Sequence, residues 1–204
     1  MRLDLVGQSE RDDDNRQGNT SRLLNFYREP LGSGAKSSHV LKGVPRSNDF
    51  VILPQLFVRD MIEVGGTLYA MAGNALYSVT RGGVATERGT TVSAEGARIF
   101  GAEAGKVCTV ADNRYFVWDG NTMSEPATGA FSSFGPGTYV GGYVVLPQAN
   151  GRRFQWSDLQ DASTLPGLNF ATAESTDGNI LRVMALAGRL LIFKEDAIEQ
   201  WAIT

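Results

Sequence analysis

The chain has 204 residues, which suits one domain with or without an arm, and 42% of them are hydrophobic, enough for a packed core. Its formal charge of −3 is opposite in sign to the basic surface of general nucleic-acid-binding proteins. Cys108 is the single cysteine, so no disulfide can form within the chain. The sequence shows neither the hydrophobic stretch of a signal peptide nor an apolar run of roughly 20 residues that could span a bilayer, so we expect a soluble protein made in the cytoplasm.

Residues 1–50 form the first predicted domain, an extended N-terminal arm. A polar block, residues 8–22, precedes a short apolar run at residues 23–27, which predicts one strand, and a Gly/Ser stretch follows at residues 31–38. Such a segment has too little apolar surface to order by itself. It is either a mobile terminus or an arm that orders against a neighbouring subunit, and the apolar run favours the second interpretation.

Residues 51–204 form the second predicted domain, in which one pattern recurs. Each unit has one or two glycines, an apolar strand, a turn of Asn, Asp or Gly, and a second strand with an aromatic residue. Asn, Asp and Gly tolerate the positive φ that tight hairpin turns require, so each unit predicts a β-hairpin. The four units are residues 65–79, 105–118, 141–156 and 188–201, with turns at 73–74, 112–113, 150–151 and near 195–196.

The spacing of these hairpins predicts the fold class. Their anchoring glycines, Gly66, Gly105, Gly142 and Gly188, recur every 37 to 46 residues, close to the roughly 40 to 50 residues of a propeller blade. Short strands at residues 97–100 and 180–185 fit between the hairpins. We therefore expect an all-β, propeller-like array of antiparallel hairpin blades without long helices. Four hairpins either belong to a longer protein or form an open array that neighbours complete; a generic antiparallel sandwich is the alternative.

Four aromatic residues recur on the second strands of the hairpins. Repetition on a strand favours a structural core role, although a stacking platform for sugars or bases has the same residue types. Cys108, in an apolar run, is interpreted as a small core residue. The four predicted core aromatics are Tyr77, Trp118, Trp156 and Trp201.

The residues that could carry chemistry are sparse. The single histidine, His39, lies in the arm far from Cys108 in sequence, so neither a zinc site nor a catalytic triad is predicted. Asp158, Asp161 and Glu174 could act as paired carboxylates, but acidic residues in polar loops are usually solvated. The acidic block at residues 10–14 lacks the glycine and glutamate of a calcium loop. We therefore predict no catalytic residue, no metal, no cofactor and no enzyme.

The segment from residue 138 to 201 resembles a known family. The sequence NGRRFQWS at residues 150–157, then DAST at 161–164 and LNFATAES at 168–175, resembles the packaged-DNA stabilisation or tail-hub (head-completion) proteins of short-tailed bacteriophages. SRLLNFYRE at residues 21–29 resembles an early motif of that family, with Arg28 where proline is common. Residues 41–46 match less well and lack a second glycine. The resemblance covers most of the chain from residue 21, and the family members are considerably longer.

This resemblance implies a structural role in the virion tail or neck. Such proteins form a ring, expected to be a hexamer, that closes the portal vertex after packaging, stabilises the packaged DNA and becomes part of the ejection conduit. The implied partners are other copies, a portal-adaptor protein above, and tailspike, needle or other distal tail proteins below. DNA would pass without sequence-specific binding, and the chain would insert into no membrane. Residues 51–204 contain 11 basic and 15 acidic residues, which suggests a mildly acidic lumen that repels phosphates.

Two segments are the expected contact surfaces. The first is the arm at residues 21–46, and the second is the loop at residues 157–175 together with the preceding arginines. The rival function is a carbohydrate-binding or glycoside-cleaving propeller, which needs paired carboxylates roughly 5 to 10 Å apart in a cleft. A WD-type scaffold is disfavoured because the Trp-Asp dipeptide occurs once, at residues 118–119. The predicted interface residues are Arg22, Leu24, Asn25, Phe26, Tyr27, Arg152, Arg153 and Asp158.

Overall fold

The computed structural model describes residues 26–30, 39–43, 49–93 and 95–202 and divides the chain into two units, residues 1–49 and 50–204. In the first unit, β1 (Phe26–Pro30) and β2 (His39–Gly43) pair antiparallel, with Phe26 opposite Gly43. The predicted strand at residues 23–27 overlaps β1. The arm thus contains a two-stranded sheet where one strand was expected. The second strand, β2, was not predicted because it has only five residues and directly follows a Gly/Ser stretch.

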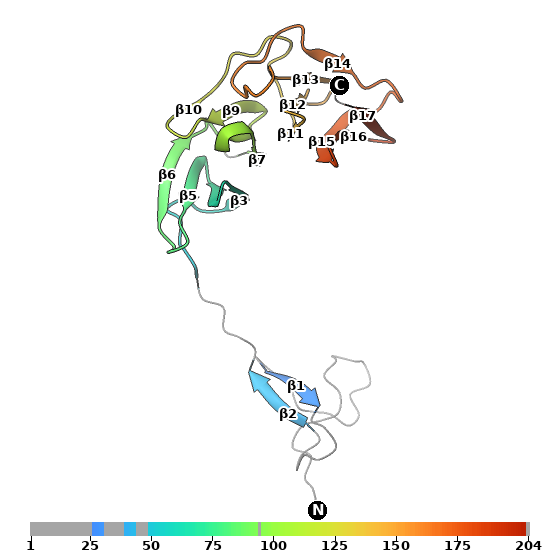
Figure 1. Cartoon of the computed structure of the whole chain (residues 1–204). Helices are drawn as coiled ribbons and strands as arrows, with labels where there is room; N and C mark the ends of the chain where they lie inside the picture. Colours follow the sequence, from blue (N-terminus) through green and yellow to red (C-terminus); the bar gives the residue numbers. More distant parts are fainter. Residues whose placement is uncertain (1–25, 31–38, 44–48, 94, 203–204) are drawn as a thin grey trace, which may run out of the picture. The chain divides into compact units, whose positions relative to one another are not determined.

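The second unit contains four antiparallel sheets, each made of strands that are consecutive in the sequence (Figure 1). We call these sheets blades 1 to 4. Blade 1 contains β3 (Val58–Val64), β4 (Thr67–Ala72), β5 (Ala75–Val79) and β6 (Ala85–Thr90). Blade 2 contains β7 (Arg98–Gly101), β8 (Val107–Ala111), β9 (Arg114–Trp118) and β10 (Met123–Ser124). Blade 3 contains β11 (Thr138–Val140), β12 (Tyr143–Pro147), β13 (Arg153–Trp156) and β14 (Phe170–Thr172), and blade 4 contains β15 (Ile180–Leu186), β16 (Arg189–Lys194) and β17 (Ile198–Ala202).

The four predicted hairpins are the central strand pairs of the four blades: β4–β5, β8–β9, β12–β13 and β16–β17. At the second turn, Asp112 and Asn113 both have positive φ, 51° and 59°, which is the backbone conformation that a tight hairpin turn requires. The short strands predicted at residues 97–100 and 180–185 correspond to β7 and β15. The prediction of an all-β, propeller-like array is confirmed.

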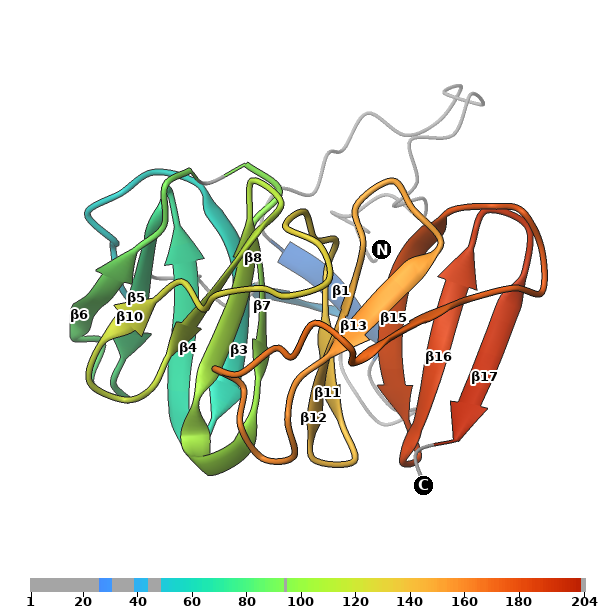
Figure 2. The same cartoon turned by 90° about the horizontal axis from the view of Figure 1, so that it is seen from above.

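The blades stand side by side along an arc (Figures 1 and 2). Their first strands, β3, β7, β11 and β15, lie on its inner side, where each packs against the next. In the described residues the four sheets do not close into a ring. The one helical segment among them is a single 3₁₀ turn at Glu103–Gly105, and none of their helices is long and apolar enough to cross a membrane.

Each pair of neighbouring blades encloses its own apolar core. Met71, Leu76 and Trp118 lie in the core between blades 1 and 2. Between blades 2 and 3 the core contains Phe100, Val117 and Leu146, and between blades 3 and 4 it contains Phe154, Leu190 and Ile192. Complete burial of one such side chain contributes about 1.5 to 3 kcal/mol. The arc is therefore stabilised by three successive face-to-face cores.

Candidate interaction interface

The predicted contact residues of the arm lie at the edge of the described structure. Arg22, Leu24 and Asn25 are outside the described residues. Phe26 and Tyr27 are the first two residues of β1, and their backbones pair with Gly43 and Lys42. These two residues therefore belong to a hairpin strand.

Arg152 and Arg153 lie at the beginning of β13, on the surface of blade 3. A guanidinium nitrogen of Arg152, Nη1, donates a hydrogen bond to Asp177 Oδ1 over 2.6 Å, and the Asp177 side chain is fully exposed. Such an exposed pair contributes at most about 1 kcal/mol. The Arg153 guanidinium lies 5.9 Å from the centre of the Phe170 ring, a cation–π contact that holds it against β14. Both arginines thus have partners within their own chain.

Asp158 lies at the opposite end of β13 from the two arginines. It is exposed, and its backbone N–H donates to the carbonyl of Thr164 over 3.0 Å, which closes the base of the following loop. Because Arg152 and Arg153 lie at the start of β13 and Asp158 follows its end, the structure does not bring these three predicted residues together.

The loop after β13 is fixed to blade 2. The backbone N–H of Ala162 donates to Glu103 Oε1 over 2.7 Å, and Lys106 Nζ lies 2.9 Å from the same oxygen. The Tyr115 hydroxyl donates to the carbonyl of Ala162 over 2.9 Å. We call these four residues the inter-blade clamp. The clamp holds the loop against blade 2, and Leu159 of this loop is exposed to solvent.

Asp161 also stabilises this loop. Its carboxylate accepts hydrogen bonds from the Thr164 hydroxyl over 2.6 Å and from the Ser163 backbone N–H over 2.9 Å. These bonds, with Lys106 nearby, lower the pKa of Asp161. A general acid needs a raised pKa, so Asp161 is unsuited to that role. The other two candidate carboxylates, of Asp158 and Glu174, belong to exposed residues on either side of the loop and β14.

The four predicted core aromatics have two different environments. Tyr77 and Trp118 are 2% and 4% exposed. Trp156 and Trp201 are only partly buried, on the facing strands β13 and β17. The two tryptophans thus pack against the core between blades 3 and 4 while also reaching its surface.

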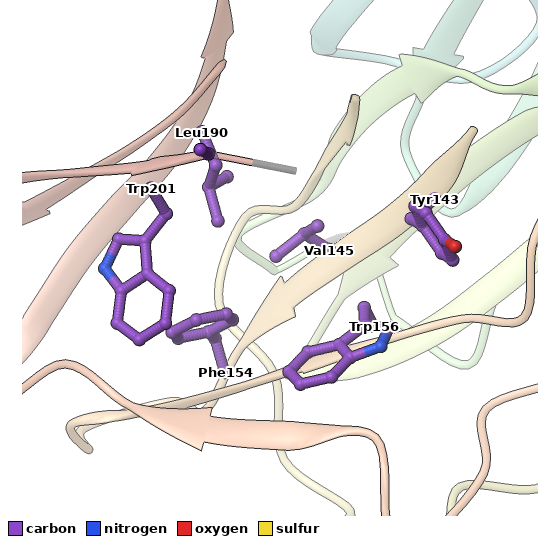
Figure 3. A pocket seen from close by; sticks show the side chains of 7 residues that line it. Tyr143, Val145, Phe154, Trp156, Leu190 and Trp201 are labelled. Carbon is purple, nitrogen blue, oxygen red and sulfur yellow. The ribbon is translucent and has the colours of Figure 1, made fainter. Parts of the chain in front are cut away.

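Trp156 and Trp201 line a pocket of about 210 Å³ between blades 3 and 4 (Figure 3). Phe154 lies between them and meets Trp201 edge to face, with ring centres 5.1 Å apart. The volume is below the range of about 300 to 1,000 Å³ typical of small-molecule sites, and no carboxylate lines the pocket, so it lacks the groups that glycoside cleavage needs. Its lining residues are Tyr143, Val145, Phe154, Trp156, Leu190, Trp201 and Ala202.

A family model described as bacteriophage P22 Gp10, β-propeller, a phage-stabilisation protein, matches residues 61–204. The chain belongs to this family. The match covers blades 2 to 4 and blade 1 from residue 61 onward, so the arc described above is the part of the chain that carries the family assignment. Membership of this family identifies the chain as a bacteriophage structural protein.

Solved structures confirm the propeller fold at low sequence identity. The computationally designed Ika4 protein is 13% identical, with a TM-score of 0.57 over 78% of this chain and 100% of Ika4. Virginiamycin B lyase from Staphylococcus aureus is 11% identical, with a TM-score of 0.55 over 88% of this chain and 63% of the lyase. A streptogramin B lyase is 14% identical, with a TM-score of 0.53 over 88% of this chain and 62% of that one. No curated protein sequence matches.

The inter-blade clamp was not visible in the sequence, since Glu103 and Ala162 are 59 residues apart. Its electrostatics give a testable pH dependence. Burial raises the pKa of Glu103, but hydrogen bonds from the Ala162 N–H and from Lys106 outweigh it, so the net pKa is lowered. A lowered folded-state pKa stabilises the fold above the unfolded pKa, and this stabilisation is lost as the pH falls through the folded value.

We expect the melting temperature to fall as the pH is lowered below about 5, and Glu103→Gln to flatten part of that fall. Thermal unfolding followed by circular dichroism between about pH 7 and pH 3 measures both curves. The matched control is Glu174→Gln, which removes an exposed carboxylate at the far side of the loop. Parallel curves for the wild type and Glu103→Gln would contradict the assignment.

Proposed function

We propose that this chain is a tail-hub component of the virion that closes the portal vertex after DNA packaging and retains the packaged genome. It would later form part of the ejection conduit. The observation that supports this proposal most directly is the phage-stabilisation family match over residues 61–204. The fold suits a load-bearing part, because three buried cores and the inter-blade clamp fix the blades to one another.

The proposed partners are other copies of the chain in a ring, expected to be a hexamer, with a portal-adaptor protein above and distal tail proteins such as a tailspike or needle below. The arm at residues 21–46 is proposed as one contact. A two-stranded sheet such as β1–β2 is marginal in water without a further surface to pack on. DNA would pass without sequence-specific recognition.

The inner edge of the arc does not supply an acidic channel lining. The charged residues of its four inner strands are Arg59, Arg98, Arg182, Asp60 and Glu63, which have no acidic excess. If an acidic lumen exists in the assembled ring, other surfaces of the chain must line it.

The rival proposal is a carbohydrate-binding or glycoside-cleaving propeller. The aromatic pocket between blades 3 and 4 is the feature that would favour it, but the pocket is small and no carboxylate lines it. The two lyases among the structural neighbours show the fold alone at 11% and 14% identity. We therefore favour the structural role in the virion.

Retention of DNA by phage heads tests the proposed function. Particles assembled without this protein should package DNA and then lose it, so nuclease-protected DNA per head should fall sharply. Adding the purified full-length chain to freshly filled heads should restore protection. Heads that keep their DNA without the protein would exclude the proposed role.

The arm contact has its own test in the native mass of the chain with and without residues 1–46. We expect a discrete oligomer for the full chain and a smaller species after truncation. Light scattering after gel filtration measures both masses. An unchanged mass on truncation would remove the arm as the self-contact.

A further inference from the structure

The loop between β12 and β13 contains the one Asn-Gly pair of the sequence, Asn150–Gly151. Asn150 is exposed, and its backbone has a positive φ of 53°. The Gln148 N–H donates a hydrogen bond to the Arg153 carbonyl over 2.8 Å, which closes the base of the loop. The pair therefore lies at the surface of blade 3, within a short connection between two central strands.

An asparagine followed by a glycine places an electrophile beside a nucleophile. The backbone nitrogen of the glycine can attack the side-chain amide carbon of the asparagine, and the missing side chain of glycine leaves that approach open. A carbon–nitrogen bond forms, the bond to the side-chain nitrogen breaks, and ammonia leaves a five-membered imide. Water then opens the imide at either of its two carbonyls, which gives an aspartate or an isoaspartate.

The fold leaves both reacting groups of this pair free of competing bonds. In the part of the chain that the structure describes, the side-chain amide of Asn150 forms no hydrogen bond, and the Gly151 N–H has no acceptor. The attack therefore requires no hydrogen bond of the fold to be broken first.

The other asparagines in the described ranges are better protected. Each of them precedes a residue that has a side chain, which hinders the approach of the backbone nitrogen. Asn74 Nδ2 also donates to the Thr91 carbonyl over 3.0 Å, and Asn179 Nδ2 donates to Glu195 Oε1 over 3.4 Å. These two residues serve as internal comparisons for Asn150.

The loop also holds the connection between blades 3 and 4. The Gly151 carbonyl accepts the Ile180 N–H over 2.8 Å, and the Arg152 carbonyl accepts the Ala173 N–H over 2.9 Å. The Arg152 guanidinium donates to Asp177 in the same connection. The two residues after the asparagine therefore anchor the segment that leads from β14 into β15.

The two products have different effects on this anchor. An aspartate keeps the main chain as it is and adds one negative charge to an exposed side chain. An isoaspartate carries the main chain through its Cβ and Cγ, which inserts one atom before Gly151 and displaces the two anchoring carbonyls. Ala173 and Ile180 are buried, so the loss of acceptors for their N–H groups is destabilising.

We propose that Asn150 is a site of spontaneous deamidation, and that its isoaspartate product loosens the junction between blades 3 and 4. The change consumes only water and releases ammonia, so it is irreversible and accumulates with the age of the protein. This proposal concerns the chain itself, and it holds whether or not the virion role is correct.

Peptide mapping by mass spectrometry tests the first part on the folded full-length chain, kept at mildly alkaline pH for increasing times. Deamidation adds the small mass gained when NH₂ is replaced by OH, and chromatography separates the aspartate and isoaspartate peptides. We expect Asn150 to convert at least about tenfold faster than Asn74 or Asn179. An Asn150 that stays intact, or that converts no faster than those two, would overturn the proposal.

Two variants test the cause and the consequence. Gly151→Ala should slow the conversion to the rate of the other asparagines. Gly151 does not have a positive φ, and the added Cβ meets only the flexible Gln148 side chain, so the variant is expected to fold. Freshly prepared Asn150→Asp carries the new charge without the lengthened main chain, so circular dichroism should show a melting temperature near that of fresh wild type.

Aged wild-type protein should melt at a lower temperature than fresh Asn150→Asp, and the difference should grow with the measured isoaspartate content. Gly151→Ala aged in the same way is the control for all other ageing reactions and should keep its melting temperature. Aged wild type that melts together with Asn150→Asp would disprove the effect on the junction. DNA retention by heads is measured on fresh protein, so its outcome is distinguishable from this one.

Discussion

Replacing Tyr115 with alanine is expected to destabilise the fold by about 3 to 5 kcal/mol, the range for removing a buried aromatic ring. The residue is 1% exposed in the core between blades 2 and 3, and its ring meets Phe134 edge to face at 6.4 Å. Its hydroxyl donates to the carbonyl of Ala162, so the substitution also opens the inter-blade clamp. Urea denaturation followed by tryptophan fluorescence measures the free energy of unfolding.

Tyr115→Phe separates these two contributions. The ring remains, but the Ala162 carbonyl loses its donor, which costs about 1 to 3 kcal/mol. The hydroxyl is also 3.1 Å from Cys108 Sγ, whose pKa burial raises to about 12, so that thiol stays protonated. If the phenylalanine variant lost as much stability as the alanine variant, the hydrogen bond rather than the ring would dominate.

The sequence predicted the hairpins because their signals are local. A tight turn needs residues that accept positive φ, and the Asp112–Asn113 pair provides them between two apolar strands. The regular return of this pattern predicted propeller-like blades. Cys108 is completely buried, as its apolar neighbours predicted.

The outermost strands could not be predicted in the same way. β6 has the sequence ATERGT, without the alternation of a half-buried strand, and β10 has two residues. Such strands form because an already formed β5 or β9 offers free backbone hydrogen-bonding groups. Their signal lies in the pairing partner and not in their own residues.

The candidate surfaces were predictable only in part. Arg152 and Arg153 were predicted as contact residues because arginine is common at the centre of interfaces. In the structure both side chains have partners in their own chain. Residues 50–56 alternate between exposed and partly buried side chains, but apolar residues occupy both sides, so the sequence shows no two-residue period there. The apolar residues on both sides of β15, β16 and β17 give no signal for a contact surface, because apolar residues on both sides of a strand are also what a fully covered blade requires.

Lys194 gives the second large expected effect. Its side chain is completely buried; Nζ donates to the carbonyls of Ala173 and Thr176 and lies 3.5 Å from Glu199 Oε1. These contacts attach the segment between β14 and β15 to β16. Lys194→Ala leaves a largely buried carboxylate and two carbonyls without their cation, so we expect a loss of about 3 to 5 kcal/mol, measured by urea denaturation.

Two further variants identify the cause of that loss. Lys194→Met keeps most of the volume, so any destabilisation that it retains comes from the unpaired polar groups. Adding Glu199→Gln removes the uncompensated charge. Its amide oxygen can replace only one of two acceptors, Oε1, which accepts the Ser175 N–H over 2.8 Å, or Oε2, which accepts the Trp201 Nε1–H over 2.9 Å, so the recovery is expected to be partial. Partial recovery in the double variant would show that the buried charge dominates. A double variant no more stable than Lys194→Met would place the effect in the two carbonyls, and thus in the connection between blades 3 and 4.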